Sequence, residues 1–118
     1  MANPFVHVEL NTPDPETAKS FYSKLFQWQL EDVPNPAVPT GTYTMVKVGE
    51  GTGGGIMEQI PNGPSGWLAY VEVDDIRAAT KKANDAPARK RNVTKGRDVS
   101  TYRFSFRVIP GAMKANNW

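Results

Sequence analysis

The chain has 118 residues, of which 39% are hydrophobic, and its formal net charge is +2. This length supports one folded domain with a substantial core but not two independent ones. The absence of cysteine excludes disulfide bonds, thiolate metal sites and cysteine nucleophiles, and no apolar run is long enough for a membrane span, so we expect a cytoplasmic protein without a membrane segment.

Residues 5–28 predict a strand followed by a capped amphipathic helix. Apolar and polar side chains alternate over residues 6–11, so one face of the strand is apolar and the other carries His7, Glu9 and Asn11. Asp14 has the position of an N-cap, and Pro15 that of the first helical residue. A stripe at helical spacing follows, and we expect its large members to lie in the core: Ala18, Phe21, Tyr22, Leu25 and Phe26.

The next residues predict three strands. Residues 29–33 form the first, and the proline-rich residues 34–41 are a loop that cannot continue a sheet. Residues 42–48 and 55–60 form a hairpin around a glycine-rich turn. A linker rich in glycine and proline follows near the middle of the chain.

The second half repeats the opening layout. Residues 67–73 predict a strand, and a helical pattern begins at Ile76 with Asp74 as its expected cap. We therefore predict a single domain made of two repeats, at about residues 1–61 and 62–118. Towards the C-terminus only residues 102–108 alternate clearly as a strand, and one more is expected after Gly111.

Three segments resemble the vicinal oxygen chelate superfamily (glyoxalase I, bleomycin-resistance proteins and extradiol dioxygenases): FVHVELNTPDPETAKSFYSKLFQW from Phe5, GGGIM in the fourth strand, and YVEVDDIRAATKKA from Tyr70. The opening segment is similar to the family's His-x-x-Leu-x-x-x-Asp pattern. PGAM and Trp118 resemble its closing segment, with Val108-Ile109-Pro110 where the family has an aspartate. The resemblance implies an α+β fold of two βαβββ modules that form a curved mixed sheet around a cleft, and it implies a homodimer.

The resemblance also implies where a metal would bind. Metal-using members carry His, Glu or Gln at four inward positions. His7 occupies the first, and the others fall near Met57 and Glu58, at Leu68 or Tyr70, and near Ala115. Because a catalytic divalent ion needs three ligands and an open position, we expect no metal and no other cofactor. If Zn, Ni, Mn or Fe does bind, His7 and Glu58 are the candidate ligands.

Other residues predict a site for a small organic molecule. Glu9 lies beside His7 on the same strand face and can orient its imidazole, so this pair is the candidate general base. Flat and polarizable side chains bind organic molecules through area and stacking, and the candidates are Tyr43, Met45, Tyr70, Trp67 and Phe104. We therefore predict a small-molecule binder without the full metal centre; the alternative is a metal-dependent lyase or dioxygenase that uses His7, and whether the chain is an enzyme stays open.

Charge is divided unevenly along the chain. Residues 1–76 have a balance of −7 and residues 77–118 one of +9. The basic segment 77–97 gives a second alternative, a binder of nucleic acid or acidic partners. It lacks the interleaved aromatic side chains that single-strand binders use for stacking, so a solvated surface is favoured and nucleic acid is not an expected partner.

Overall fold

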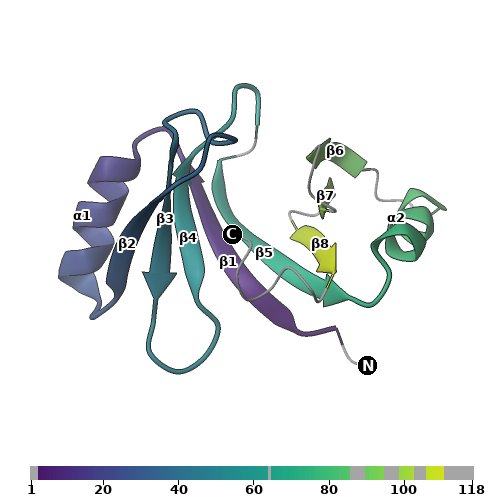
Figure 1. Cartoon of the computed structure of the whole chain (residues 1–118), viewed down its shortest axis with the longest axis horizontal. Helices are drawn as coiled ribbons and strands as arrows, with labels where there is room; N and C mark the ends of the chain where they lie inside the picture. The colour runs from purple at the N-terminus through teal and green to yellow at the C-terminus, as the bar shows by residue number, and fades with distance from the viewer. Residues whose placement is uncertain (1–2, 64, 86–89, 95–98, 103–105, 111–118) are drawn as a thin grey trace. The chain divides into compact units, whose positions relative to one another are not determined.

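The structure, a computed structural model, describes residues 3–63, 65–85, 90–94, 99–102 and 106–110. The chain divides into two compact units. One is His7–Leu68, and the other combines Met1–Val6 with Ala69–Trp118. In each half of the chain a helix follows the opening strand and further strands come after it, and the fold class is α+β (Figure 1).

The first module has the order strand, helix and three strands: β1 (Phe5–Thr12), α1 (Pro15–Leu25), β2 (Gln29–Pro34), β3 (Thr42–Lys47) and β4 (Gly54–Glu58). Its strands lie in the order β2-β3-β4-β1. β1 runs parallel to β4, whereas the β2–β3 and β3–β4 pairs are antiparallel. The predicted hairpin and the end of β2 at the proline-rich loop are confirmed.

The start of α1 follows the sequence prediction. The Asp14 side chain accepts hydrogen bonds from the Thr17 backbone N–H at 3.1 Å and the Thr17 hydroxyl at 2.6 Å. Pro15 occupies the first helical position, where its missing N–H leaves no intrahelical bond unmade. These bonds hold the pKa of Asp14 below its ordinary value.

The apolar stripe of α1 is only partly in the core, contrary to our prediction. Phe21 and Leu25 are each 56% exposed and Phe26 is 44% exposed. Ala18 and Tyr22 do pack against the buried cluster of Leu10, Val46 and Ile56. The stripe spans a wider arc than one helix–sheet contact covers, so the side chains at its margins stay at the surface.

The second module repeats the same connectivity: β5 (Gly66–Val73), α2 (Ile76–Asp85), β6 (Lys90–Thr94), β7 (Val99–Tyr102) and β8 (Phe106–Pro110). Its strand order is β6-β7-β8-β5, with β5 parallel to β8 and the other pairs antiparallel. The prediction of two βαβββ modules is confirmed. The repeat boundary near residue 61 stays a prediction.

The cap of α2 differs from our expectation. The Asp75 side chain, not that of Asp74, accepts the backbone N–H groups of Arg77 at 3.0 Å and Ala78 at 3.2 Å. Either aspartate satisfies the sequence rule for a cap, and only the backbone path selects one. The strand expected after Gly111 lies outside the described residues. Over the ranges that are described, no helix is long and apolar enough to cross a membrane.

Candidate functional site

Three polar side chains of β1 are buried in the first module. His7, Glu9 and Asn11 are only 3%, 2% and 4% exposed. Because side chains alternate along a strand, Leu10 faces the cluster under α1 while these three lie on the opposite face of the sheet. Burial of a carboxylate and an imidazole is unfavourable unless both find hydrogen-bond partners, so their neighbours decide what this face can do.

Tyr43 of β3 connects the polar side chains of β1. Its hydroxyl donates to Glu9 Oε2 at 2.7 Å and lies 2.8 Å from His7 Nε2. Asn11 Nδ2 donates to Glu9 Oε1 at 3.1 Å. Since the Tyr43 proton is directed at Glu9, the proton of the second bond comes from His7 Nε2. We expected Glu9 to orient His7 itself, and the structure joins the two through Tyr43.

Gly55 makes this bridge possible. It pairs with Glu9 on one side and with Met45 on the other, so β4 separates the strands that carry the bridge. A Cβ on Gly55 would overlap the Oη, Cε1 and Cζ atoms of Tyr43. The Tyr43 ring therefore crosses β4 at Gly55, which has no side chain on this face of the sheet. We call His7, Tyr43, Glu9 and Asn11 the polar network.

The polar network lies beside an apolar cluster. Tyr43 packs with Val38 and Met57, and Met45 is partly buried against them. Val38 belongs to the loop after β2, which is held by backbone bonds from Asn35 to Gly41 and from Gly41 to Val38. The face thus combines a carboxylate, an imidazole and a phenol with the methionine surfaces predicted from the sequence.

Several other predicted residues lie elsewhere. Glu58 pairs with Thr12, two positions beyond the pairing of Leu10 with Ile56, and so lies on the face opposite to His7. Tyr70 is buried in the second unit. Phe104 and Ala115 lie outside the described residues.

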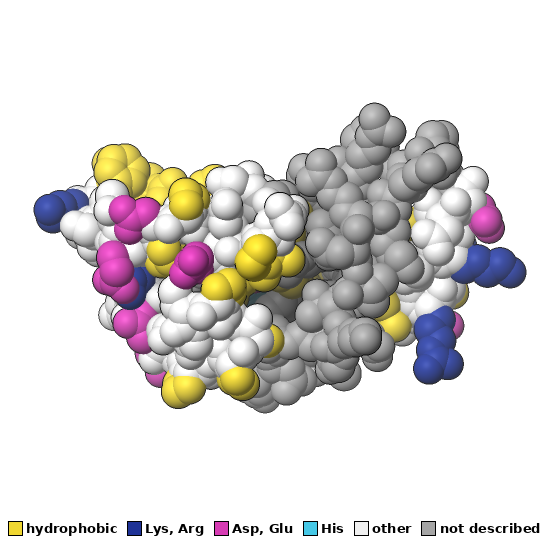
Figure 2. Space-filling model, turned by 90° about the horizontal axis from the view of Figure 1, so that it is seen from above, with side chains coloured by type: hydrophobic (Ala, Val, Ile, Leu, Met, Phe, Trp, Pro, Cys, Tyr) yellow, Lys and Arg dark blue, Asp and Glu magenta, His cyan; other side chains and the backbone are white. Residues whose placement is uncertain are grey.

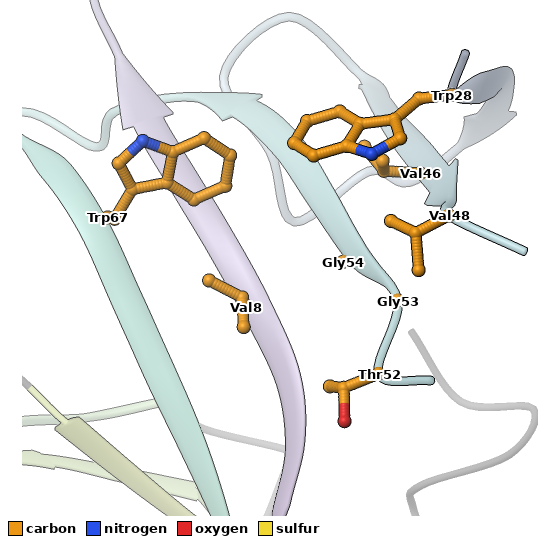
Figure 3. A pocket seen from close by; sticks show the side chains of 8 residues that line it. All are labelled: Val8, Trp28, Val46, Val48, Thr52, Gly53, Gly54 and Trp67. Atoms are coloured by element: carbon orange, nitrogen blue, oxygen red, sulfur yellow. The ribbon is translucent and has the colours of Figure 1, made fainter. Parts of the chain in front are cut away.

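Trp67 lines a pocket in the first unit. This pocket has a volume of about 250 Å³ and is lined by Val8, Trp28, Val46, Val48, Thr52, Gly53, Gly54 and Trp67. Figure 3 shows the two indoles flanking the space, with Val8 between them. The pocket is on the α1 side of the sheet, because Val46 belongs to the cluster under α1. The sequence indicated Trp67 as a ligand contact but not these partners, although the glycine run was a visible signal of close strand approach.

A second polar group ties α1 to the sheet. Lys19 Nζ lies 2.7 Å from Glu16 and 3.3 Å from Asp32, and Thr44 donates its hydroxyl to Asp32 at 2.6 Å. The hydrogen bond to Glu16 is the main cause that raises the pKa of Lys19. The bond from Thr44 is the main cause that lowers the pKa of Asp32. These bonds are structural, since they join α1, β2 and β3.

Acidic side chains outnumber basic ones in the first half of the chain, and basic ones predominate after residue 76. Figure 2 shows Asp and Glu side chains gathered on the part that contains α1. Arg77, Lys81 and Lys82 lie exposed on α2 or at its edge. Arg89, Lys95 and Arg97 lie outside the described residues. Binding of nucleic acid or acidic partners through segment 77–97 therefore stays a prediction.

Comparison with known proteins identifies the family. The model of the Glyoxalase/Bleomycin resistance protein/Dioxygenase superfamily matches residues 5–107. The chain belongs to this superfamily. Proteins named "Putative glyoxylase CFP32" from Mycobacterium bovis and Mycobacterium tuberculosis are each 35% identical over 79 residues, which is 64% of this chain and 30% of theirs. The match thus spans less than a third of the length of these relatives.

Solved structures share the superfamily fold. A hypothetical protein from Bacillus halodurans C-125 has a TM-score of 0.65 at 13% identity, over 93% of this chain and 95% of its own. The methylmalonyl-CoA epimerase from Mycobacterium tuberculosis has a TM-score of 0.60 at 13% identity, over 90% of this chain and 86% of its own. At such low identity the likeness shows the fold alone.

Histidine and cysteine, the common protein ligands of a catalytic zinc ion, are scarce in this superfamily member. The chain has a single histidine and no cysteine. Within the described ranges no three His, Asp or Glu side chains are grouped so that they could hold an ion. From residue 86 onward the sequence contains Asp98 but no Glu or His. His7 and Glu9 each hydrogen-bond to the phenol of Tyr43.

Proposed function

We propose that this superfamily member binds a small organic molecule on the His7 face of its first module and needs no metal to do so. The observation that carries the proposal is the Tyr43 hydroxyl between His7 and Glu9, at 2.8 and 2.7 Å. It replaces a metal as the group that organises the imidazole and the carboxylate. Met45 and Met57 supply polarizable surface next to it.

The side chains of the polar network and the neighbouring methionines indicate the chemical class of the ligand. Polar groups that are fixed in a largely apolar surrounding select ligands that can hydrogen-bond to them. A flat molecule with a hydroxyl, carbonyl or carboxylate group fits this requirement, since the Asn11 amide has a second N–H that can donate and the Glu9 carboxylate oxygens can accept. The methionines would contact its apolar surface.

Catalysis is an extension of this proposal. A proton that the His7 imidazole takes from a substrate can be balanced by transfer of its Nε2 proton to Tyr43, whose own proton passes to Glu9. Such a relay would make His7 a general base and Glu9 the final acceptor. The alternative is a metal-dependent, glyoxalase-like lyase or dioxygenase that uses His7, and the mycobacterial relatives are named as putative glyoxylases.

Elemental analysis after incubation with Zn, Ni, Mn or Fe distinguishes the metal-free binder from the metal-dependent alternative. We expect well under one metal per chain in wild type and in His7→Ala. Near one metal per wild-type chain, lost in His7→Ala, would overturn the metal-free proposal. It would support the lyase instead.

A thermal-shift screen of small aromatic and polar compounds, with and without a chelator, tests the binding. We expect a compound that raises the melting temperature equally in both conditions. Its effect should be lost in Tyr43→Phe and kept in Phe21→Ala, because Phe21 lies exposed on α1. A chelator-sensitive effect, or one that survives Tyr43→Phe, contradicts the proposal.

We also propose that the protein pairs into a homodimer, as the family resemblance implies. Light scattering checks this directly, since the dimer has twice the 13.0 kDa mass of one chain. A mass of 13.0 kDa at all concentrations contradicts it.

A further inference from the structure

The pocket between Trp28 and Trp67 is separate from the polar network. Val8 and Val46 lie on the α1 side of the sheet, and His7 and Tyr43 lie on its other side. A molecule in this pocket therefore contacts none of the groups of the proposed function. The pocket is a second candidate site in the same compact unit, His7–Leu68.

Aromatic walls define the shape of this pocket. The Trp28 and Trp67 ring centroids are 6.4 Å apart with an interplanar angle of 83° (Figure 3). Trp28 contacts Phe26 and Tyr22, with ring centroids at 4.8 and 5.6 Å, and Tyr22 also meets Trp67 edge-on at 5.5 Å. Both indoles are thus held by ring contacts, and Trp67, which is 42% exposed, forms the outer wall. An aromatic ligand can stack on one indole and meet the other edge-on.

Glycines keep the inner wall of the pocket rigid. A Cβ on Gly54 would collide with the Val8 carbonyl, and one on Gly53 would lie 2.9 Å from the Val46 carbonyl. The strands therefore approach closely here, and no side chain of these two residues can move into the space. Val8, Val46 and Val48 provide the remaining apolar surface.

The size and charge of the pocket select the class of ligand. Its volume of about 250 Å³ exceeds the roughly 150 Å³ of an apolar cavity that holds benzene, so two fused rings fit. None of the eight lining residues is charged, and Thr52 is their only hydroxyl. A charged group would lose hydration here without meeting a side chain of opposite charge among these eight residues.

We propose that the Trp28–Trp67 pocket binds a flat, uncharged aromatic molecule of about two fused rings. The probe is 2-naphthol, measured by calorimetry and tryptophan fluorescence, with 2-naphthalenesulfonate as the charged comparator. We expect saturable one-to-one binding of 2-naphthol. The sulfonate should bind at least about tenfold more weakly, because the ionised group cannot be desolvated in an uncharged pocket.

Two variants test the location of the site. Trp67→Ala removes the exposed outer wall, and Val48→Phe fills the pocket from the end of β3. Each should weaken 2-naphthol binding by about tenfold or more, as expected for loss of a central aromatic contact or of the space itself. Phe21→Ala removes an exposed aromatic that does not line the pocket, and Tyr43→Phe alters the polar network; both should bind 2-naphthol as wild type does. If the thermal-shift screen finds no ligand that depends on Tyr43, the outcome of the 2-naphthol measurements is unaffected.

Circular dichroism first establishes which variants fold. If Trp67→Ala does not fold, the Val48→Phe variant and the comparison of 2-naphthol with 2-naphthalenesulfonate in wild type still test the proposal. Equal 2-naphthol affinity in wild type and Val48→Phe would overturn the proposal. So would equal binding of the sulfonate. Tryptophan fluorescence that changes with protein concentration while 2-naphthol fails to bind would mean that a second copy of the chain covers the pocket, which also overturns it.

Discussion

Replacement of Gly55 by alanine tests the central contact of the proposed site. The new Cβ would overlap the outer atoms of the Tyr43 ring, so the ring must move away from β4. Its hydroxyl then leaves both Glu9 and His7, which lie 2.7 and 2.8 Å away. All three residues are nearly fully buried, so water cannot easily take over these bonds.

The expected decrease in stability follows from the loss of these two hydrogen bonds. A hydrogen bond to a charged group contributes about 1.5–3 kcal/mol and a neutral one about 1 kcal/mol, so their loss destabilises the fold by about 2–4 kcal/mol. Alanine in a strand is otherwise favoured over glycine by roughly 0.5–1 kcal/mol. The net expectation is a destabilisation of about 1–3 kcal/mol, or a melting temperature roughly 4–12 °C lower for a domain of this size.

Urea unfolding followed by circular dichroism measures this difference. Tyr43→Leu provides the matched background, because leucine keeps apolar bulk but lacks the atoms that overlap the new Cβ. In that background Gly55→Ala should be neutral or slightly stabilising. Two outcomes would contradict the contact of Tyr43 with Gly55, and with it the bridge between His7 and Glu9. In one, Gly55→Ala is as stable as wild type. In the other, Gly55→Ala lowers the free energy of unfolding by the same amount in wild type and in Tyr43→Leu.

Three further changes have distinct expected outcomes. Tyr43→Phe keeps the ring but removes the hydroxyl from His7 and Glu9, so chemical unfolding should show a loss of about 1–3 kcal/mol; an unchanged midpoint would contradict the network. Ile56→Ala empties a site that is 0% exposed and should destabilise by about 2–5 kcal/mol, whereas Phe21→Ala on the exposed margin of α1 should change stability by less than about 0.5 kcal/mol. The Asp32 pKa is lowered in the fold, chiefly by the Thr44 hydroxyl, so its contribution is present above the pKa of the unfolded chain and is lost as the pH falls through the folded pKa. Wild type should therefore exceed Asp32→Asn in stability at pH 6 and lose that advantage in acid, and a difference independent of pH would refute this assignment.

Local sequence patterns account for much of the fold. The Asp14 cap, the Pro15 start and the alternation of β1 all involve neighbours in the chain, and the structure confirms each of them. The wrong prediction for α1 arises because a local pattern was used to predict burial, which depends on tertiary contacts. Periodicity placed Phe21, Leu25 and Phe26 on one apolar stripe, but it carries no information on how much of that stripe the sheet can cover.

The sequence by itself determined the repeated order of strand, cap and helix and the polar face of β1 with His7 and Glu9, because strand and helix periods and caps are local properties. The α+β class with two βαβββ modules followed from the resemblance of its segments to the superfamily. Only the tertiary structure decided that Tyr43 stands between His7 and Glu9, that Glu58 faces away from them, and that Trp28 meets Trp67. Each of these depends on the register of strands far apart in the chain, where a shift of one residue moves every side chain to the other face. Gly55 shows the reason most directly, since its missing side chain matters only once β1, β4 and β3 lie side by side.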